Sequence, residues 1–278
     1  MFSLGEFLKS GKQTKLMGIV NVSGDSFSEG SKSSADSAMT RALALLDAGA
    51  DVLDIGGEST RPGAAELSYR LEMHRVLPVL EALKRARNST IFSIDTRHVE
   101  VAEAALKSGA HIINDVSMLR NSPEIAEVVA KYDASIILNH SRGTPENMQS
   151  AKFCAYPAGV AAEVAAELAE ARQTAIKCGV RPENIILDPG IGFAKTPEQC
   201  WELLRDLEQI APLSDMVVGV SRKFFLGSLT GEKLPERRLG ETLAVELSLA
   251  ARGVAMLRTH AVRELHNALI VTEHLGRL

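Results

Sequence analysis

The chain has 278 residues, of which 45% are hydrophobic and 24% are charged, and its formal net charge is -4. These values are typical of a soluble globular protein with one large core or two modest ones, and they argue against a nucleic-acid partner. The three cysteines are unclustered and odd in number, which argues against a disulfide framework and a zinc site. No stretch approaches the roughly 18 apolar residues of a membrane span, and the N-terminus lacks a long apolar signal region. We therefore expect a soluble, cytoplasmic protein with no membrane partner.

Short aliphatic runs alternate with segments of helical periodicity along the whole chain. The runs predict strands at Leu16–Val22, Val52–Ile55, Ile91–Ile94, His111–Ile113, Ser135–Leu138, Ile185–Leu187, Met216–Val220 and Ala255–Leu257. The periodic segments predict helices at Ser37–Ala48, Tyr69–Ala86, Val99–Lys107, Pro123–Lys131, Gly159–Lys177, Pro197–Ile210, Leu239–Ala251 and Val262–Leu275. Glycine follows several of these helices, as in "DAGAD" and "KSGAH", where a left-handed C-cap precedes the next strand.

Eight strand–helix units in about 250 residues predict an α/β protein with the (β/α)₈ TIM-barrel fold. A doubly wound sheet is the alternative. No linker or low-complexity tract divides the chain, so residues 1–278 are expected to form a single domain, with residues 1–13 as an N-terminal lead-in segment.

Polar residues follow all eight predicted strands, at the end where a TIM barrel builds its active site. Each one alone has a simple explanation as a turn former or helix N-cap, but a purely structural interpretation does not predict the whole set. Asp95 in "SIDT" and Asp188 in "ILDPGIGF" end apolar runs, and a buried carboxylate requires a partner. Together with Asn114 and Lys223, they predict a pocket for a ring whose edge carries adjacent N–H donors, such as a guanine-like or pterin-like ring.

Cationic residues at neighbouring strand ends predict a second subsite, for an anion. Arg61 in "ESTRPGA" follows the second strand, and Arg258 and His260 in "RTH" follow the eighth. Asn21, at the end of the first strand, offers a neutral oxygen that would complete the octahedral shell of Mg²⁺ together with phosphate oxygens and waters. The expected anion is a diphosphate.

Two glycine-bearing segments have less specific interpretations. "DPGIGF" lacks the Lys-Ser/Thr of a P-loop and the spacing of a dinucleotide-binding fingerprint, and its glycines are better explained as backbone clearance beside a flat ring. "NVSGDSFSEGS" is polar and rich in small residues, which is typical of a lid that closes over a site, and an ordinary long loop is the alternative.

Seven segments, in order along nearly the whole chain, resemble the signatures of the dihydropteroate synthase family. They are "MGIVNVSGDSFSEG", "DVLDIGGESTRPGA", "FSIDTRHVEVAEAALKSGAHIINDVS", "NHSRGTPENMQ", "ILDPGIGFAKT", "GVSRKFFLG" and "LRTHAV". The resemblance implies a TIM barrel, a homodimer and a transferase of folate synthesis. Such an enzyme condenses 6-hydroxymethyl-7,8-dihydropterin diphosphate with p-aminobenzoate, giving 7,8-dihydropteroate and pyrophosphate.

The resemblance also implies roles for individual residues. The implied pterin pocket consists of Asp95, Asn114, Asn139, Asp188, Gly192, Phe193 and Lys223. The implied diphosphate site consists of Asn21, Arg61, Arg258 and His260, with Asn21 as the metal ligand for Mg²⁺. The implied p-aminobenzoate pocket consists of Phe27, Thr60, Arg61, Pro62, Ser221 and Lys223. The implied catalytic residues, for a dissociative SN1-like course in which diphosphate leaves first, are Asp25, Arg61, Lys223, Arg258 and His260.

The sequence departs from the family pattern at five positions: Gly24, Asn139, Ala194, Phe224 and Ala261. Gly24 and Phe224 would lie near the p-aminobenzoate end of the site, so we expect them to alter p-aminobenzoate affinity or sulfonamide sensitivity.

Two other functions remain open from the sequence. One is a methyltetrahydrofolate-binding methyltransferase barrel, although "ESTRPG" and "RTH" supply a diphosphate clamp that a methyl donor would not need. The other is a diverged paralogue that binds a pterin or a partner without turnover. Pyrophosphate release from the two substrates distinguishes the three.

Overall fold

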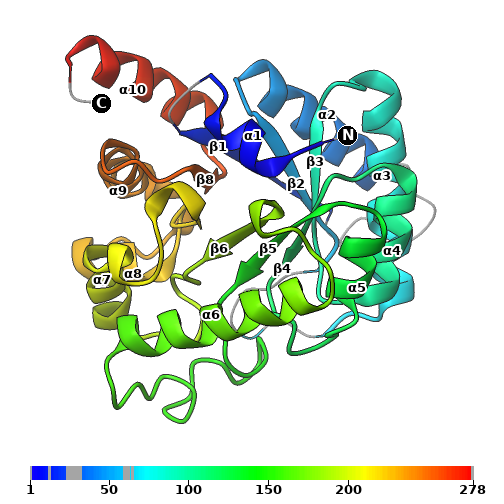
Figure 1. Ribbon diagram of the computed structural model, residues 1–278. Coiled ribbons are helices and arrows are strands. Elements are labelled where there is room, and N and C mark those ends of the chain that lie inside the picture. Colours follow the sequence, from blue (N-terminus) through cyan, green and yellow to red (C-terminus); the bar gives the residue numbers. More distant parts are fainter. Residues whose placement is uncertain (1, 12–13, 23–32, 59–62, 64–65, 277–278) are drawn as a thin grey trace.

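The strands lie at the centre of the molecule, and helices surround them (Figure 1). The structure is a computed structural model that describes residues 2–11, 14–22, 33–58, 63 and 66–276. Its strands are β1 Lys15–Asn21, β2 Val52–Gly56, β3 Ile91–Asp95, β4 Ile112–Asp115, β5 Ser135–Asn139, β6 Ile185–Asp188, β7 Val217–Val218 and β8 Met256–Thr259. Each lies within two residues of its predicted bounds at both ends.

The strands form one parallel sheet with the order β6-β5-β4-β3-β2-β1-β8-β7. A parallel bridge between Leu187 and Met216 connects β6 to the residue just before β7, so the sheet is a nearly closed barrel. In this order β1 lies between β2 and β8. The predicted TIM barrel is therefore confirmed, and the doubly wound alternative is wrong.

The helices are α1 Leu4–Lys9, α2 Ser33–Asp47, α3 Tyr69–Ala86, α4 Val99–Ser108, α5 Ile125–Lys131, α6 Val160–Lys177, α7 Pro197–Arg205, α8 Phe224–Thr230, α9 Leu239–Ala251 and α10 Val262–His274. The bounds of α3 and α9 are the predicted ones. The predicted helix Pro197–Ile210 ends earlier, because α7 stops at Arg205 and a separate 3₁₀ turn covers Leu207–Gln209. The sequence did not predict α1 and α8, which are too short for a clear helical period.

The strands bury apolar side chains on both of their faces. Alternate residues of a strand point to opposite faces, so one set packs outward against the helices and the other fills the barrel. The inner set contains Met17, Val52, Ile112, Ile137, Ile186, Val217 and Met256, together with Leu4 from α1. The short helix α1 thus closes the end of the barrel opposite to the carboxyl ends of the strands.

The same alternation determines which polar residues face the barrel interior. Positions two or four residues beyond an inner apolar residue lie on the same face of the strand. These positions are occupied by Asp54, Ser93, Asp95, Asn114, Asn139, Asp188 and Arg258. The fold therefore collects polar side chains at the carboxyl end of the barrel.

Glu246 of α9 is a fully buried carboxyl outside this group. Burial raises its pKa to about 8, although the nearby Thr259 hydroxyl acts in the opposite direction. A carboxyl whose folded-state pKa is raised lowers stability progressively as the pH rises from its unfolded-state pKa near 4.5 to about 8. We expect Glu246→Gln to have little effect on the free energy of unfolding below pH 4.5 and to raise it by on the order of a few kcal/mol at pH 8. Urea denaturation at both values measures this, and a difference independent of pH would contradict it.

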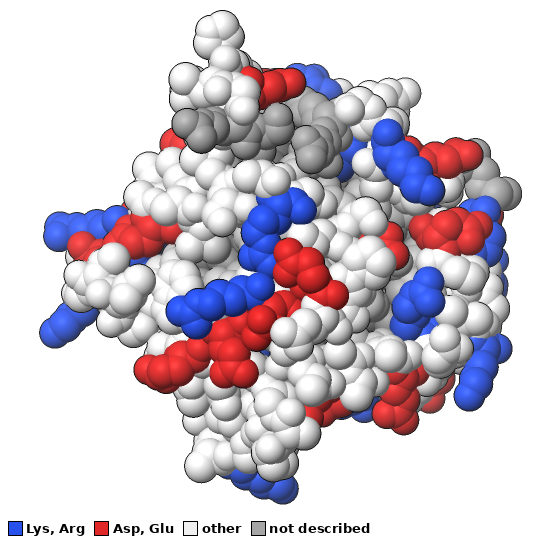
Figure 2. Space-filling model, turned by 60° about the vertical axis from the view of Figure 1, so that its left-hand side comes forward, with Lys and Arg blue, Asp and Glu red and all other residues white. Residues whose placement is uncertain are grey.

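Among the described residues, no helix is long and apolar enough to cross a membrane. On the face shown in Figure 2, acidic and basic side chains lie next to one another.

Candidate active site

An arginine and two aspartates lie together at the mouth of the barrel. Arg258 Nε is 2.6 Å from Asp54 Oδ2, and Arg258 Nη2 is 2.8 Å from Asp95 Oδ2. Asn114 Nδ2 also donates to Asp54 Oδ2, at 3.1 Å. Within the part of the chain that the structure describes, the second oxygens of Asp54 and Asp95 are buried and accept no hydrogen bond. These two oxygens are acceptors for a ligand with N–H donors.

Asp95 is the most strongly perturbed acid of this group. Burial raises its pKa to about 7, and the carboxylates of Asp54 and Glu58 add to the shift, whereas Arg258 opposes it. The two aspartates in turn hold the pKa of Arg258 above its usual range despite its burial. Asp95 is therefore poised to gain or lose a proton near neutral pH.

Asp188 and Lys223 lie on the opposite side of the mouth. Asp188 Oδ1 accepts the backbone N–H of Gly190 at 2.8 Å. Burial raises the pKa of Asp188, an effect that Lys223 partly offsets. Burial lowers the pKa of Lys223 to about 8, and Asp188 partly offsets that shift.

Lys223 packs against the segment that follows β6, next to Gly192 and Phe193. Lys223 Nζ donates to the carbonyl oxygen of Ile191 and lies 4.8 Å from the centre of the Phe193 ring. Gly192 has a φ of 85°, and a Cβ there would lie 3.3 Å from the Lys223 side chain. A glycine at this position therefore accommodates both the left-handed backbone and the adjacent lysine.

The remaining predicted site residues follow β5, β7 and β8. Asn139 is paired with Asp188 across β5 and β6, and its Nδ2 donates to the Val116 carbonyl at 3.5 Å. Ser221 Oγ accepts the backbone N–H of His260 at 3.2 Å and lies 3.1 Å from its Nδ1. The Ser221 and His260 contacts join the segments that follow β7 and β8.

Asn21 ends β1 with an exposed side chain, and its backbone carbonyl accepts a hydrogen bond from Arg41 Nη1 at 3.3 Å. Asp25, Phe27, Thr60, Arg61 and Pro62 lie outside the described residues, as does Gly24. Their predicted roles stay predictions.

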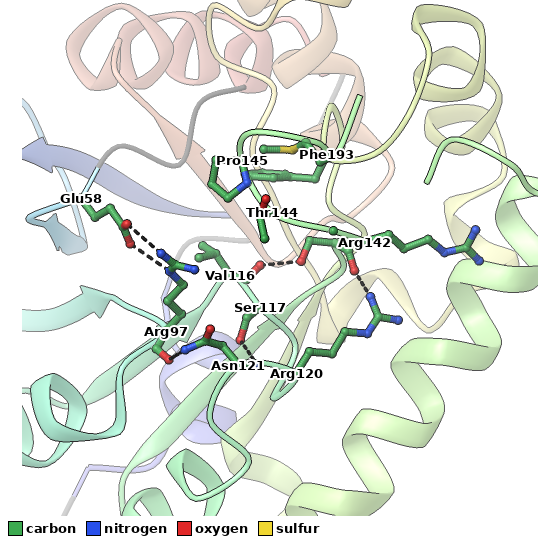
Figure 3. A pocket seen from close by; sticks show the side chains of 13 residues that line it. Glu58, Arg97, Val116, Ser117, Arg120, Asn121, Arg142, Thr144, Pro145 and Phe193 are labelled. Atoms are coloured by element: carbon green, nitrogen blue, oxygen red, sulfur yellow. Dashed lines mark hydrogen bonds and ion pairs between the residues drawn. The ribbon is translucent and has the colours of Figure 1, made fainter. Parts of the chain in front are cut away.

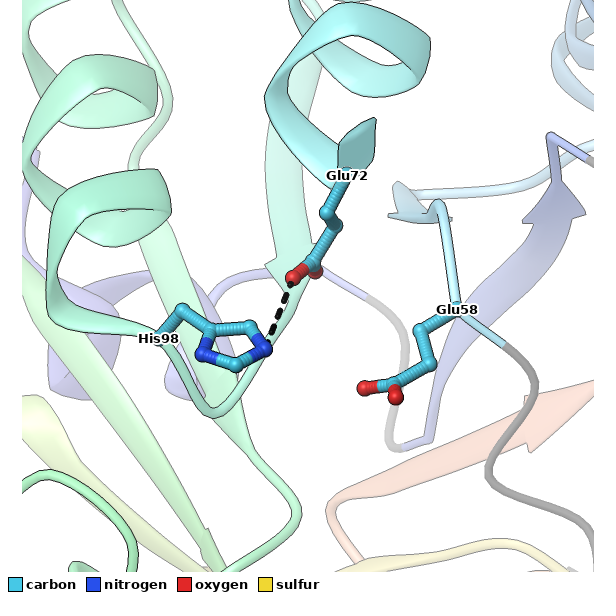
Figure 4. A group of neighbouring side chains, drawn as sticks. All are labelled: Glu58, Glu72 and His98. Carbon is cyan, nitrogen blue, oxygen red and sulfur yellow. Dashed lines mark ion pairs between the residues drawn. The ribbon is translucent and has the colours of Figure 1, made fainter. Parts of the chain in front are cut away.

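A group of possible metal ligands lies elsewhere. Its residues come from the segment after β2, from the first turn of α3 and from the position just before α4. It consists of Glu58, Glu72 and His98 (Figure 4). Burial raises the pKa of Glu72 to about 8, which favours its protonated form at neutral pH. Glu58 accepts from Arg97 Nε at 3.1 Å and from Arg97 Nη2 at 2.9 Å. A protonated acid and a carboxylate already paired with arginine are poor metal ligands, so these contacts indicate a structural network.

A cavity of about 210 Å³ opens among the segments that follow the carboxyl ends of the strands (Figure 3). Its lining residues come from the segments after β2, β3, β4, β5 and β6: Glu58, Arg97, Val116, Ser117, Arg120, Asn121, Ser141, Arg142, Gly143, Thr144, Pro145, Met148 and Phe193. Phe193 belongs to the predicted pterin pocket, but the four residues Asp95, Asn114, Asp188 and Lys223 do not line the cavity. The cavity is thus a neighbour of the predicted pterin pocket.

Sequence reasoning missed Asp54 as a site residue. It lies inside the predicted strand Val52–Ile55, and its carboxylate accepts hydrogen bonds from both Arg258 and Asn114. The signal that could have found it is the alternation along β2, because Val52 and Asp54 share the inner face.

For two residues that depart from the family pattern, the structure gives a backbone conformation or a contact that bears on the site. Ala194 is fully buried with a φ of 50°, a left-handed conformation that favours glycine. Phe224 begins α8, and its ring lies 3.6 Å from the position of a Cβ on Gly192. Its expected effect on p-aminobenzoate affinity stays a prediction.

Comparisons with known proteins agree with this geometry. A family model described as "Pterin binding enzyme" matches residues 17–260. The chain is 40% identical to a dihydropteroate synthase of Synechocystis over 96% of this chain and 92% of the relative. The folic acid synthesis protein fol1 of Schizosaccharomyces pombe is 39% identical over 90% of this chain, which spans only 34% of that protein.

Two solved structures of dihydropteroate synthase from Xanthomonas albilineans have the same fold. One contains 4-aminobenzoic acid, is 37% identical and superposes with a TM-score of 0.86 over 95% of this chain and 94% of that chain. The other contains 7,8-dihydropteroate, is 35% identical and superposes with a TM-score of 0.83 over 95% and 94%. The chain therefore belongs to the dihydropteroate synthase family of pterin-binding enzymes.

Proposed function

We propose that this transferase condenses 6-hydroxymethyl-7,8-dihydropterin diphosphate with p-aminobenzoate and forms 7,8-dihydropteroate and pyrophosphate. The observation that carries the proposal is the pair of buried carboxylates, Asp95 and Asp188, at one barrel mouth with Asn114 and Lys223. The N–H groups along one edge of a pterin would donate to the carboxylates, and Lys223 would donate to the carbonyl on the opposite edge. The Xanthomonas structures with 4-aminobenzoic acid and 7,8-dihydropteroate support both the second substrate and the product.

The residue types fit a dissociative displacement. In such a course the bond between the methylene carbon and the diphosphate oxygen breaks first, and the arylamine nitrogen then attacks the resonance-stabilised cation and loses a proton. Arg258 and His260, with Arg61, would stabilise the charge on the departing diphosphate. Ser221 and Lys223, with Phe27, Thr60 and Pro62, would bind p-aminobenzoate, and Asp25 would stabilise the developing cation.

Magnesium fits the donor set at the end of β1. Asn21 would supply one neutral protein oxygen, and phosphate oxygens and waters would supply the rest, which is a usual arrangement for Mg²⁺. The ion would neutralise charge on the diphosphate when bound.

The deciding assay supplies the purified protein with Mg²⁺, the pterin diphosphate and p-aminobenzoate and follows pyrophosphate release. Release that requires both substrates supports the synthase. Pterin binding without release supports the non-catalytic paralogue. Methyl transfer from methyltetrahydrofolate, with no pyrophosphate release, supports the methyltransferase.

The pKa of Asp95 predicts how pterin affinity depends on pH. A ligand with N–H donors requires the ionised carboxylate, and protons compete with it below a pKa of about 7. We expect the dissociation constant for 6-hydroxymethylpterin to rise as the pH falls below about 7, by up to roughly tenfold per pH unit. Calorimetry between pH 5.5 and 8 measures it, and an affinity that stays constant over this range would contradict it.

We also propose that the protein is a cytoplasmic homodimer, as the family resemblance implies. Large exposed apolar side chains on α8, on α10 and directly after α10 support this: Leu229, Ile270, Val271 and Leu275. Sedimentation equilibrium of the wild type and of Ile270→Glu tests it, and a monomeric wild type would overturn it.

A further inference from the structure

Lys195, in the segment between β6 and α7, is fully buried and has no part in the reaction proposed above. Its Nζ lies 3.0 Å from His140 Nδ1, 3.1 Å from the carbonyl oxygen of Gly190 and 3.1 Å from that of Phe193. An ammonium group has three protons and no acceptor site. Burial lowers the pKa of Lys195 to about 7, and in its charged form all three of its protons are matched by an acceptor.

His140 extends these contacts toward the protein surface. Burial lowers its pKa to about 3, so its ring is neutral, accepting at Nδ1 and donating at Nε2. Nε2 is 3.1 Å from Glu167 Oε2, and Glu167 also accepts from Arg120 and from Arg142. A continuous set of contacts thus runs from two arginines through Glu167 and His140 to Lys195.

The contacts of Lys195 belong to a larger pattern along the segment after β6. Each of five consecutive carbonyls, from residue 190 to residue 194, accepts from a side chain. Lys195 binds the first and fourth, and Lys223 binds the second. Gln149 Nε2 binds the third at 2.9 Å, and the Tyr156 hydroxyl binds the fifth at 3.0 Å. Side chains thus supply hydrogen-bond partners along this irregular segment, in which the Gly190 carbonyl also accepts the backbone N–H of Phe193 at 3.0 Å.

This segment also orients two parts of the predicted pterin pocket. Gly190 donates its N–H to Asp188 Oδ1 while its carbonyl is held by Lys195. A Cβ on Gly190 would lie 1.8 Å from the His140 carbonyl oxygen, so the two backbones are in direct contact. Phe193 likewise carries a ring beside Lys223 and a carbonyl held by Lys195. The contacts of Gly190 and Phe193 with Lys195 therefore help to fix the positions of the Asp188 carboxylate and of the Phe193 ring.

We propose that Lys195 is a positioning residue for the pterin subsite. Its ammonium group, anchored on His140, holds the carbonyls of Gly190 and Phe193 so that Asp188 and Phe193 face the ligand. This inference rests on the proposed function, because it assumes that the mouth of the barrel binds a pterin. It predicts a selective loss of pterin affinity, since the segment carries Phe193 and binds Asp188, whereas Lys223, which both predicted pockets share, contacts it through the Ile191 carbonyl and the Phe193 ring.

The test compares Lys195→Met, which preserves side-chain length and removes every donor, with Lys195→Gln, which retains an N–H donor. Lys177→Met, at the exposed end of α6, is the matched control. Calorimetry with 6-hydroxymethylpterin measures binding without turnover, and steady-state kinetics give the KM for p-aminobenzoate. We expect Lys195→Met to weaken pterin binding at least tenfold, Lys195→Gln to weaken it less, and both to keep the KM for p-aminobenzoate within twofold.

Several outcomes would overturn the inference. Pterin affinity within twofold of the wild type in Lys195→Met contradicts it, and so do equal losses for both substrates, which indicate general loosening of the fold. If Lys195→Met does not fold, Lys195→Gln decides by the same comparison, with a threshold of threefold. A wild type that binds pterin but releases no pyrophosphate contradicts the proposed function alone, whereas a wild type that binds no pterin contradicts both.

Discussion

Asp188→Ala is expected to abolish measurable pterin binding. The Asp188 carboxylate is nearly fully buried and accepts a hydrogen bond from the N–H of Gly190. A ligand whose N–H groups pair with this carboxylate forms charge-assisted hydrogen bonds away from water, which are the stronger kind. We expect a loss of about 3 kcal/mol or more, equivalent to at least roughly a hundredfold in the dissociation constant measured by calorimetry.

The same substitution should not destabilise the protein. Burial raises the pKa of Asp188, which means that the folded state disfavours its charged form. Removing it should leave the free energy of unfolding near neutral pH unchanged or raise it. Glu246→Gln is the control, because it removes another buried carboxyl that lies between α9 and β8, and it should change stability without changing pterin affinity. A variant of Asp188 that binds pterin with parental affinity would remove this residue from the pocket.

Arg258→Ala is expected to slow turnover about a hundredfold, because one charged contact to the leaving group contributes about 3 kcal/mol to the transition state. Pterin binding should survive at a pH high enough to ionise Asp95 without the guanidinium. The structure adds a second consequence. Arg258 lowers the pKa of Asp95, so its removal should move the pH dependence of pterin affinity to higher pH.

Steady-state kinetics and calorimetry at pH 6 and pH 8 separate the two effects. Arg205→Ala, an exposed arginine at the end of α7, is the matched control and should retain parental turnover. Unchanged turnover in Arg258→Ala would exclude Arg258 from the chemical step. An unchanged pH dependence would show that Arg258 and Asp95 are not coupled in solution.

The order of elements and the polar residues at the ends of the strands were readable from the sequence for a physical reason. Buried parallel strands need continuous aliphatic runs, and the helices that cover them need one apolar face, so both leave strong periodic signals. A carboxylate or amide at the end of a buried run is also visible, as with Asp95 and Asp188, because burial of such a group needs a partner. The short helices α1 and α8 left no such signal.

The sequence by itself therefore determined the barrel and the polar residues at the ends of its strands, since these depend on local periodicity. Only the tertiary structure decided how those residues pair. Arg258 comes from β8 and reaches Asp54 of β2 and Asp95 of β3, and Lys195 reaches His140 beyond β5. Closure of the sheet places these groups together across as many as 204 residues of chain. Such pairings depend on side-chain reach and burial inside a closed barrel, which no local pattern of residues records.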